Sequence, residues 1–268
     1  MPTTDALLTL APVLRCPHCA GSLHVDGNTL ACERRHGFDV ARQGYVNLLA
    51  RAAPANADTP AMLRARAAFQ EAGHYRPVAR AVSGALGEAE RILEAGAGTG
   101  YYLAAALDAR PDAVGLATDV SPAATKMAAR AHSRMAAVVA DTWSGLPIAD
   151  ETFDAVLCVF APRNAAEFGR VLRPGGRLVV VVPTAEHLAE LRDDYALLGV
   201  PVGKAAAVAQ SFDGWAHRAE RVEAELDLTA DDVANLIAMG PNAFHGLPAA
   251  TAPAKTTLSV DLVALTKP

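Results

Sequence analysis

The run Leu93-Glu94-Ala95-Gly96-Ala97-Gly98-Thr99-Gly100 decides the fold class of this 268-residue chain. Its first three residues end the short apolar stretch 91–95, which predicts a strand. The run is followed by residues 101–109, which predict a helix. A G-x-G-x-G turn between a strand and a helix lets the backbone approach a ligand closely and directs amide groups at it. Because dinucleotide-binding enzymes use a similar turn, the run by itself predicts a nucleotide site without identifying the ligand.

Strands and helices alternate after this turn. Further apolar runs predict strands at 113–118, 136–140, 153–160 and 176–182, with helical stretches between them at 121–131 and 165–172. This alternation predicts an α/β fold, with a parallel sheet covered by helices on both faces. Two more strands are expected at 221–228 and 256–266, separated by a helix at 229–239. The last strand follows a loop without a clear crossover helix, which suits antiparallel insertion.

Two acidic residues follow predicted strands where a nucleotide would lie. Asp119 comes about 20 residues after the glycine turn and can accept hydrogen bonds from both ribose hydroxyls, which also fits NAD. Asp141 ends the third strand, where it suits the exocyclic amine of adenine. The alternative for each is a helix cap or a solvated loop end. No further dinucleotide signal follows; instead the run 172–176, Leu-Arg-Pro-Gly-Gly, precedes the fifth strand.

Three of the four cysteines lie close together near the N-terminus. Cys16, Cys19, Cys32 and His36 have the spacing C-x2-C-x12-C-x3-H, which brings four ligands to one tetrahedral zinc ion. His18 and His24 compete with His36 for the fourth position, but only His36 mirrors the spacing of a second metal-binding turn. Four protein ligands leave no open position, so a structural zinc ion is predicted. Cys158 lies in an apolar run and is expected to be a buried small hydrophobe.

Charge and composition suggest how the chain is organised. The net charge of −5 argues mildly against a protein that simply coats nucleic acid. Residues 1–80 nevertheless hold nine Arg, no Lys and six acids, a net charge of +3, although a biased genome would also enrich Arg. We expect a zinc-binding, RNA-recognising module at 1–50, a helical connector at 51–87 and a nucleotide-binding domain at 88–268. No membrane span or secretory signal is recognisable, so a cytoplasmic protein without a membrane partner is expected.

The motifs together resemble two known groups of proteins. The glycine turn, Asp119, Asp141 and 172–176 resemble class I S-adenosylmethionine-dependent methyltransferases, although Glu94 stands where the first glycine is usually preceded by Asp. The ordered combination of several other segments resembles the RlmA family of 23S rRNA guanine-N1 methyltransferases, in the Gram-positive branch that includes macrolide-resistance enzymes. Those segments are 15–19, 32–39, 41–49, 72–75, 159–164 and 187–191.

The resemblance implies a fold, a reaction and a set of functional residues. The fold is a Rossmann-like sheet of seven strands, one of them antiparallel, with the zinc module in front of it. The zinc ligands are the four residues already named, and the residues expected to bind the donor S-adenosylmethionine are Tyr75, Glu94, Gly96, Gly98, Thr99, Gly100, Asp119, Asp141 and His187. Substrate-side candidates are Phe160, Arg163 and Asn164, with Pro162 and Asn164 as turn and helix-cap residues in the alternative interpretation. RNA-binding candidates are Arg15, Arg34, Arg35 and Arg42.

The implied reaction sets requirements on the substrate. Guanine N1 carries a proton and faces its partner base in a duplex, so the target must be unpaired or flipped out, which favours a hairpin in ribosomal RNA. A homodimer could present two zinc modules to a folded RNA. Two other functions compete with RNA methylation. One is methylation of a small natural product, and the zinc module argues against it. The other is RNA binding without catalysis, and the intact glycine turn, Asp119 and Asp141 argue against it.

Overall fold

The structure is a computed structural model that describes residues 4–195, 197–240, 243 and 251–268. Its helices are α1 (Asp5–Leu10), η1 (Ala11–Val13), α2 (Pro60–Glu71), α3 (Arg76–Ala85), α4 (Tyr101–Asp108), α5 (Pro122–Ala128), α6 (Ala165–Val171), α7 (Ala189–Tyr195), α8 (Lys204–Gln210) and α9 (Ala230–Ala238). Its strands are β1 (His24–Asp26), β2 (Thr29–Ala31), β3 (Gly37–Asp39), β4 (Tyr45–Asn47), β5 (Arg91–Ala95), β6 (Val114–Asp119), β7 (Met135–Val139), β8 (Phe153–Val159), β9 (Leu172–Pro183), β10 (Ala216–Leu228) and β11 (Ala254–Thr266).

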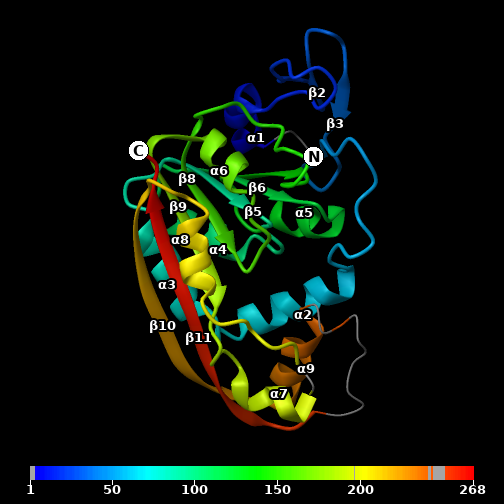
Figure 1. Ribbon diagram of the computed structural model, residues 1–268. Coiled ribbons are helices and arrows are strands. Elements are labelled where there is room, and N and C mark those ends of the chain that lie inside the picture. The colour runs from blue at the N-terminus through cyan, green and yellow to red at the C-terminus, as the bar shows by residue number, and fades with distance from the viewer. Residues whose placement is uncertain (1–3, 196, 241–242, 244–250) are drawn as a thin grey trace.

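A central sheet lies between two layers of helices, as the alternation of strands and helices predicts. Strands β7 and β8 and the second half of β9, residues 178–182, are mainly apolar runs whose side chains are buried on both faces, the pattern of a sheet covered on both sides. One hydrophobic cluster joins the sheet to α1, α6 and α8, and a second joins it to α3, α4 and α9. Figure 1 shows α2 and α9 side by side at the lower end of the molecule, with the zinc module at the upper end.

The sheet has eight strands among the described residues, in the order β10-β11-β9-β8-β5-β6-β7-β4. The strands from β4 to β9 run parallel, and β11 is inserted antiparallel between β9 and β10, as expected for the last strand. The expected number of seven is therefore wrong. The additional strand is β4, which pairs in parallel with β7 through Val46 and Val138 and satisfies part of an edge that would otherwise be open.

The N-terminal residues contribute to both parts of the molecule. Strands β1, β2 and β3 form a separate three-stranded antiparallel sheet; Cys16 and Cys19 lie in the segment before β1, and Cys32 lies between β2 and β3. In contrast, Leu7 and Leu10 of α1 and Val46 of β4 are fully buried in the core cluster of the large sheet. The segment 1–50 is thus partly a zinc module and partly a layer of the large domain's core.

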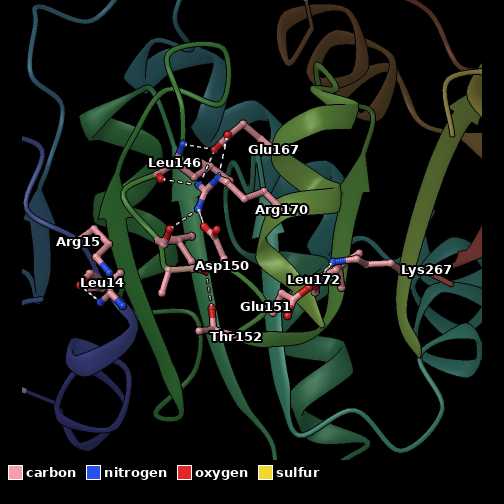
Figure 2. A network of polar contacts seen from close by, with 12 residues as sticks. Leu14, Arg15, Leu146, Asp150, Glu151, Thr152, Glu167, Arg170, Leu172 and Lys267 are labelled. Atoms are coloured by element: carbon pink, nitrogen blue, oxygen red, sulfur yellow. Dashed lines mark hydrogen bonds and ion pairs between the residues drawn. The ribbon is translucent and has the colours of Figure 1, made fainter. Parts of the chain in front are cut away.

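A loop between β7 and β8, residues 146–150, contacts both the zinc module and α6, and Figure 2 shows its contacts with Arg170 of α6. On one side of the loop, the Arg15 amide donates to the Pro147 carbonyl at 2.8 Å. On the other side, Arg170 of α6 donates to two carbonyl groups of the loop and forms an ion pair with Glu167. The loop therefore has a fixed position between the two parts of the chain. No helix in the described residues is long and apolar enough to cross a membrane.

Candidate functional site

A cavity of about 510 Å³ lies at the carboxyl ends of the central parallel strands. Parallel α/β sheets place ligands at this edge, and the volume suits a cofactor-sized molecule. Six of the nine residues expected to bind the donor line it: Tyr75, Glu94, Gly96, Gly98, Asp119 and Asp141. Phe160, at the end of β8, lines the same cavity.

The glycine turn has the conformation that its sequence predicts. Gly96, Gly98 and Gly100 have φ of 71°, 54° and 80°, in the left-handed region that favours glycine. A Cβ atom at Gly96 would lie 2.5 Å from the Cβ of Ala161, so only glycine allows the turn to pack against the loop after β8. The next two residues of the motif are not among those that line the cavity: the Thr99 hydroxyl donates at 2.6 Å to Gln70, which does line it, and Gly100 is the N-cap of α4.

Asp119 and Asp141 lie at neighbouring strand ends in different electrostatic surroundings. Asp119 accepts hydrogen bonds from the amides of Gly98 and Ser121, both at 2.8–2.9 Å, yet its burial raises the pKa of its carboxyl group. Burial also acts to raise the pKa of Asp141. Hydrogen bonds from the Ser144 hydroxyl and the Trp143 amide, together with the Arg51 guanidinium, outweigh burial and lower that pKa. Asp141 is therefore an ionised acceptor at the end of the cavity formed by β7.

Glu94 is a buried carboxyl group next to the glycine turn. It is 1% exposed and accepts a hydrogen bond from the Leu103 amide at 3.1 Å. Burial raises the pKa of Glu94 to about 8, although the Leu103 amide acts in the opposite direction. Glu94 is therefore mainly protonated at neutral pH and contributes no full charge to the cavity.

Replacing Glu94 with glutamine is expected to remove a pH dependence of stability. The folded protein holds Glu94 protonated up to about pH 8, whereas the unfolded chain loses this proton near pH 4.5. Folding therefore takes up a proton between these pH values. As pH rises through that window, the free energy of unfolding of the wild type should fall relative to that of Glu94→Gln by up to about 1.4 kcal/mol per pH unit. Urea unfolding of both proteins at several pH values, without donor, measures this. A difference that stays constant with pH would contradict the assignment.

A buried hydroxyl group indicates that the cavity is shaped for a polar ligand. The Tyr102 hydroxyl is buried and has no hydrogen-bond partner among the described residues, although Tyr102 lines the cavity. Buried polar groups are rarely left unpaired, because the lost hydrogen bond costs about 1–3 kcal/mol. The unpaired hydroxyl, the glycine turn and the two carboxylates fit the amino-acid, ribose and adenine parts of S-adenosylmethionine.

Aromatic rings surround Phe160 at the mouth of the cavity. Phe160 has a φ of 54°, which is strained for a residue with a side chain, and the residue remains 39% exposed. Its ring centroid lies 5.7 Å from Tyr75, 6.0 Å from His187 and 6.4 Å from Tyr102. His187 thus contacts Phe160 but is not among the residues that line the cavity, and burial together with Arg192 and Lys204 lowers the pKa of its imidazole to about 4.

The remaining residues of the loop after β8 have structural contacts. The side-chain oxygen Oδ1 of Asn164 accepts from the Glu167 amide and caps α6, while its side-chain amide Nδ2 donates to the Thr142 carbonyl at 3.0 Å. Both ends of the side chain are therefore engaged, as in the cap interpretation. Arg163 is half-buried, and neither Arg163 nor Asn164 is among the residues that line the cavity.

Several residues at the cavity were not identified from the sequence. Arg66 and Tyr102 line it from α2 and α4, and Arg51 binds Asp141 from the connector. Trp143 also lines it, and its side chain is 64% exposed. No local motif marks these positions, because each reaches the cavity from its own segment of the chain. An exposed Trp two residues after a predicted site residue is the one signal that could have been used.

Cys16, Cys19, Cys32 and His36 converge at the base of the zinc module. All four ligand atoms lie within 4.8 Å of one another. The Cys16 and Cys32 sulfurs are each 3.4 Å from Nδ1 of His36, and the Cys19 and Cys32 sulfurs are 3.7 Å apart. Zn–S and Zn–N bonds of about 2.3 and 2.0–2.1 Å in a tetrahedron give edges of about 3.5–3.8 Å, so the four atoms fit one structural zinc ion.

The other two histidines of the module are not in this cluster. The His18 ring packs against the rings of His36 and Phe38, with centroids 5.1 and 5.7 Å apart, and is exposed. His24 lies on β1 and is also exposed. The choice of His36 over the two alternatives therefore agrees with the geometry.

The arginines of the zinc module have two kinds of surroundings. Arg34, Arg35 and Arg42 are exposed, and none of them forms an ion pair with the described residues. Arg15 is half-buried, and its guanidinium donates to the carbonyls of Pro12 and Leu14. The three exposed side chains are free to contact phosphate groups, whereas Arg15 supports the junction with the large domain.

Comparison with known proteins agrees with both sites. The family described as "RlmA, N-terminal", a zinc ribbon, matches residues 14–53, and a methyltransferase domain family matches residues 92–176. Solved structures of low identity share the fold. One is a chain in the complex between the Haloferax volcanii Trm112 methyltransferase activator and a methyltransferase, with a TM-score of 0.51 and 18% identity, covering 77% of this chain and 94% of that chain.

Relatives of higher identity extend over most of the chain. A Streptomyces fradiae 23S rRNA (guanine(748)-N(1))-methyltransferase is 46% identical, covering 87% of this chain and 86% of that protein. A Micromonospora griseorubida protein provisionally named as a 23S rRNA (guanine-N(1)-)-methyltransferase is also 46% identical, covering 97% of this chain and 94% of that protein. A demethylmenaquinone methyltransferase from Mycobacterium sp. (strain KMS) is 35% identical but covers only 52% of this chain. The chain therefore belongs to the RlmA family of 23S rRNA guanine-N1 methyltransferases, enzymes that use S-adenosylmethionine and carry a zinc ribbon.

Proposed function

We propose that this enzyme methylates N1 of an unpaired guanine in a hairpin of 23S rRNA. The observation that carries the proposal is the 46% identity to 23S rRNA (guanine-N1)-methyltransferases, which for the Micromonospora griseorubida protein covers 97% of this chain and therefore includes the zinc ribbon as well as the donor domain. The exposed arginines 34, 35 and 42 of the zinc module support it, because guanidinium groups bind phosphate with a planar fork. The exposed ring of Phe160 supports it too, since flipped bases are held by stacking.

The residues at the cavity have separate tasks in this proposal. When bound, S-adenosylmethionine supplies an electrophilic methyl group. Asp141 holds the adenine end and Asp119 the ribose, while the aromatic residues around Phe160 hold the target base in line with the methyl group. Guanine N1 gives up its proton to water or another base before or as it attacks the methyl group, and the resulting anion shares its negative charge with O6 until the N1–CH3 bond forms and S-adenosylhomocysteine leaves. Arg163, on the loop that carries Phe160, is our candidate for stabilising that charge.

Primer extension on 23S rRNA tests the proposal directly. A methyl group on guanine N1 blocks the Watson–Crick edge, so reverse transcriptase should stop at one site after treatment with enzyme and donor. Naked rRNA and ribosomal subunits are both used as substrate, and a reaction without donor is the control. Binding to RNA should also weaken as salt rises, because phosphate contacts release counterions.

One combination of results would contradict methylation of 23S rRNA. Absence of a donor-dependent stop on both substrates, together with efficient methylation of a small molecule, would favour the alternative of small-molecule methylation. The demethylmenaquinone methyltransferases match about half of this chain, so a quinone precursor is a suitable probe for that alternative.

A further inference from the structure

Arg66 lies on α2, in the connector, and its guanidinium group packs directly against the glycine turn. Its Nη1 atom is 2.5 Å from Oδ2 of Asp58, and its Nη2 atom is 2.7 Å from the carbonyl oxygen of Met239 at the end of α9. A Cβ atom at Gly98 would lie 2.8 Å from Nη1, so the guanidinium occupies the space that glycine leaves open. The side chain is 23% exposed and lines the cavity.

The charges of the cavity are strongly uneven. Four residues with carboxyl groups line it, at positions 58, 94, 119 and 141, of which Glu94 is mainly protonated, and among the described lining residues Arg66 is the only Lys or Arg. S-adenosylmethionine carries a carboxylate at its amino-acid end. A carboxylate that enters a cavity bordered by acidic groups needs a cation as partner, since leaving it desolvated and unpaired is costly. Arg66 is the cation that the cavity provides.

The order of the strands places Arg66 at the correct end of the donor. From β7 to β6 to β5, the edge of the sheet carries Asp141, Asp119 and the glycine turn in turn. With the adenine at Asp141 and the ribose at Asp119, the amino-acid part extends over the glycine turn. This is where the guanidinium of Arg66 lies.

We infer that Arg66 binds the α-carboxylate of the methyl donor, with Asp58 and the end of α9 fixing the orientation of its guanidinium. A guanidinium has five N–H groups, and the described contacts use two of them, which leaves donors for a carboxylate. This inference deepens the proposed function, because it rests on S-adenosylmethionine being the donor. It gives the connector helix α2 a role in holding the donor.

Calorimetry with two ligands tests the inference. S-adenosylhomocysteine has the amino-acid carboxylate, and 5′-methylthioadenosine shares the adenosine and sulfur but lacks the amino-acid group. Arg66→Ala is expected to weaken binding of S-adenosylhomocysteine by roughly 10- to 100-fold, the range for a charge-assisted hydrogen bond. Binding of 5′-methylthioadenosine should change by less than about threefold. Arg51→Ala is the matched control: it removes an arginine paired with Asp141 at the adenine end and should weaken both ligands by similar factors.

The ratio of the two affinities separates binding from support of the fold. If Arg66 only held α2 against α9, its removal would weaken both ligands equally, and that result would overturn the inference. Arg66→Gln, which retains a donor for the Met239 carbonyl, gives the same ratio should the alanine variant fold poorly. If the wild type bound neither ligand, the proposed function itself would fail. If the wild type bound both ligands and Arg66→Ala had the same ratio of affinities as the wild type, only the role of Arg66 would be rejected.

Discussion

Replacing Phe160 with alanine is expected to lower kcat/KM for RNA by roughly 10- to 100-fold. Stacking of a base on an aromatic ring contributes about 1–3 kcal/mol, and about 1.4 kcal/mol corresponds to a factor of ten. The Phe160 ring suits this role because the residue is 39% exposed while the rings of Tyr75, Tyr102 and His187 pack against it. Affinity for S-adenosylhomocysteine should change by less than about threefold, since other residues hold the donor.

Two further variants separate the ring from the strained backbone of Phe160. Phe160→Tyr keeps the ring and should retain most of the activity. Phe160→Gly also loses the ring but adopts a φ of 54° without strain, so it should be as inactive as Phe160→Ala while being more stable by about 1 kcal/mol. Single-turnover methylation of rRNA and urea unfolding measure the two effects. Unchanged single-turnover rates for Phe160→Ala would show that the target base is held elsewhere.

The sequence predicted the central part of the fold because its signals are local. Apolar runs, the glycine turn and the alternation of strands and helices each lie within a few residues, and they define the strands from β5 to β9. Strand β4 was missed because it has three residues and pairs with β7, about 90 residues later in the chain. No pattern in so short a segment distinguishes an edge strand from a loop.

The candidate site shows the same division between local and distant signals. Asp119 and Asp141 could be proposed because each directly follows a predicted strand, and parallel strands end at one edge of a sheet. Arg66 and Tyr102 could not, because helices α2 and α4 bring them to the cavity through packing that no motif records. Thr99 shows the opposite difficulty: it belongs to the motif, but it is not among the residues that line the cavity, and its hydroxyl donates to Gln70, which is.

Replacing Cys16 with serine is expected to release the zinc ion and abolish RNA methylation, with donor binding weakened by less than tenfold. Cys16 is one of four ligands, and serine is a poor substitute for a thiolate at zinc. A sheet as small as β1–β3 buries little apolar surface, so metal binding supplies much of its folding free energy. Elemental analysis should therefore fall from one zinc per chain to nearly none, and RNA methylation by at least about 100-fold as the exposed arginines lose their position.

The large domain should remain folded in Cys16→Ser because its contacts with the N-terminal residues do not depend on the metal. Leu7, Leu10 and Val46 are buried in its core, and Arg170 holds the 146–150 loop from the side of α6. Deletion of residues 1–50 would remove those leucines and β4, so it would test the stability of the large domain rather than the zinc module. A point substitution is therefore the informative change.

His18→Ala provides the matched control for Cys16→Ser. His18 lies beside the cluster and packs on His36, but it is not among the four converging ligands. The variant should keep one zinc ion per chain and most of the methylation activity, because only a ring contact is lost. Loss of zinc from His18→Ala but not from His36→Ala would mean that His18 is the fourth ligand. Full RNA methylation by zinc-free Cys16→Ser would instead separate the zinc module from RNA recognition, since the exposed arginines would then work without an ordered support.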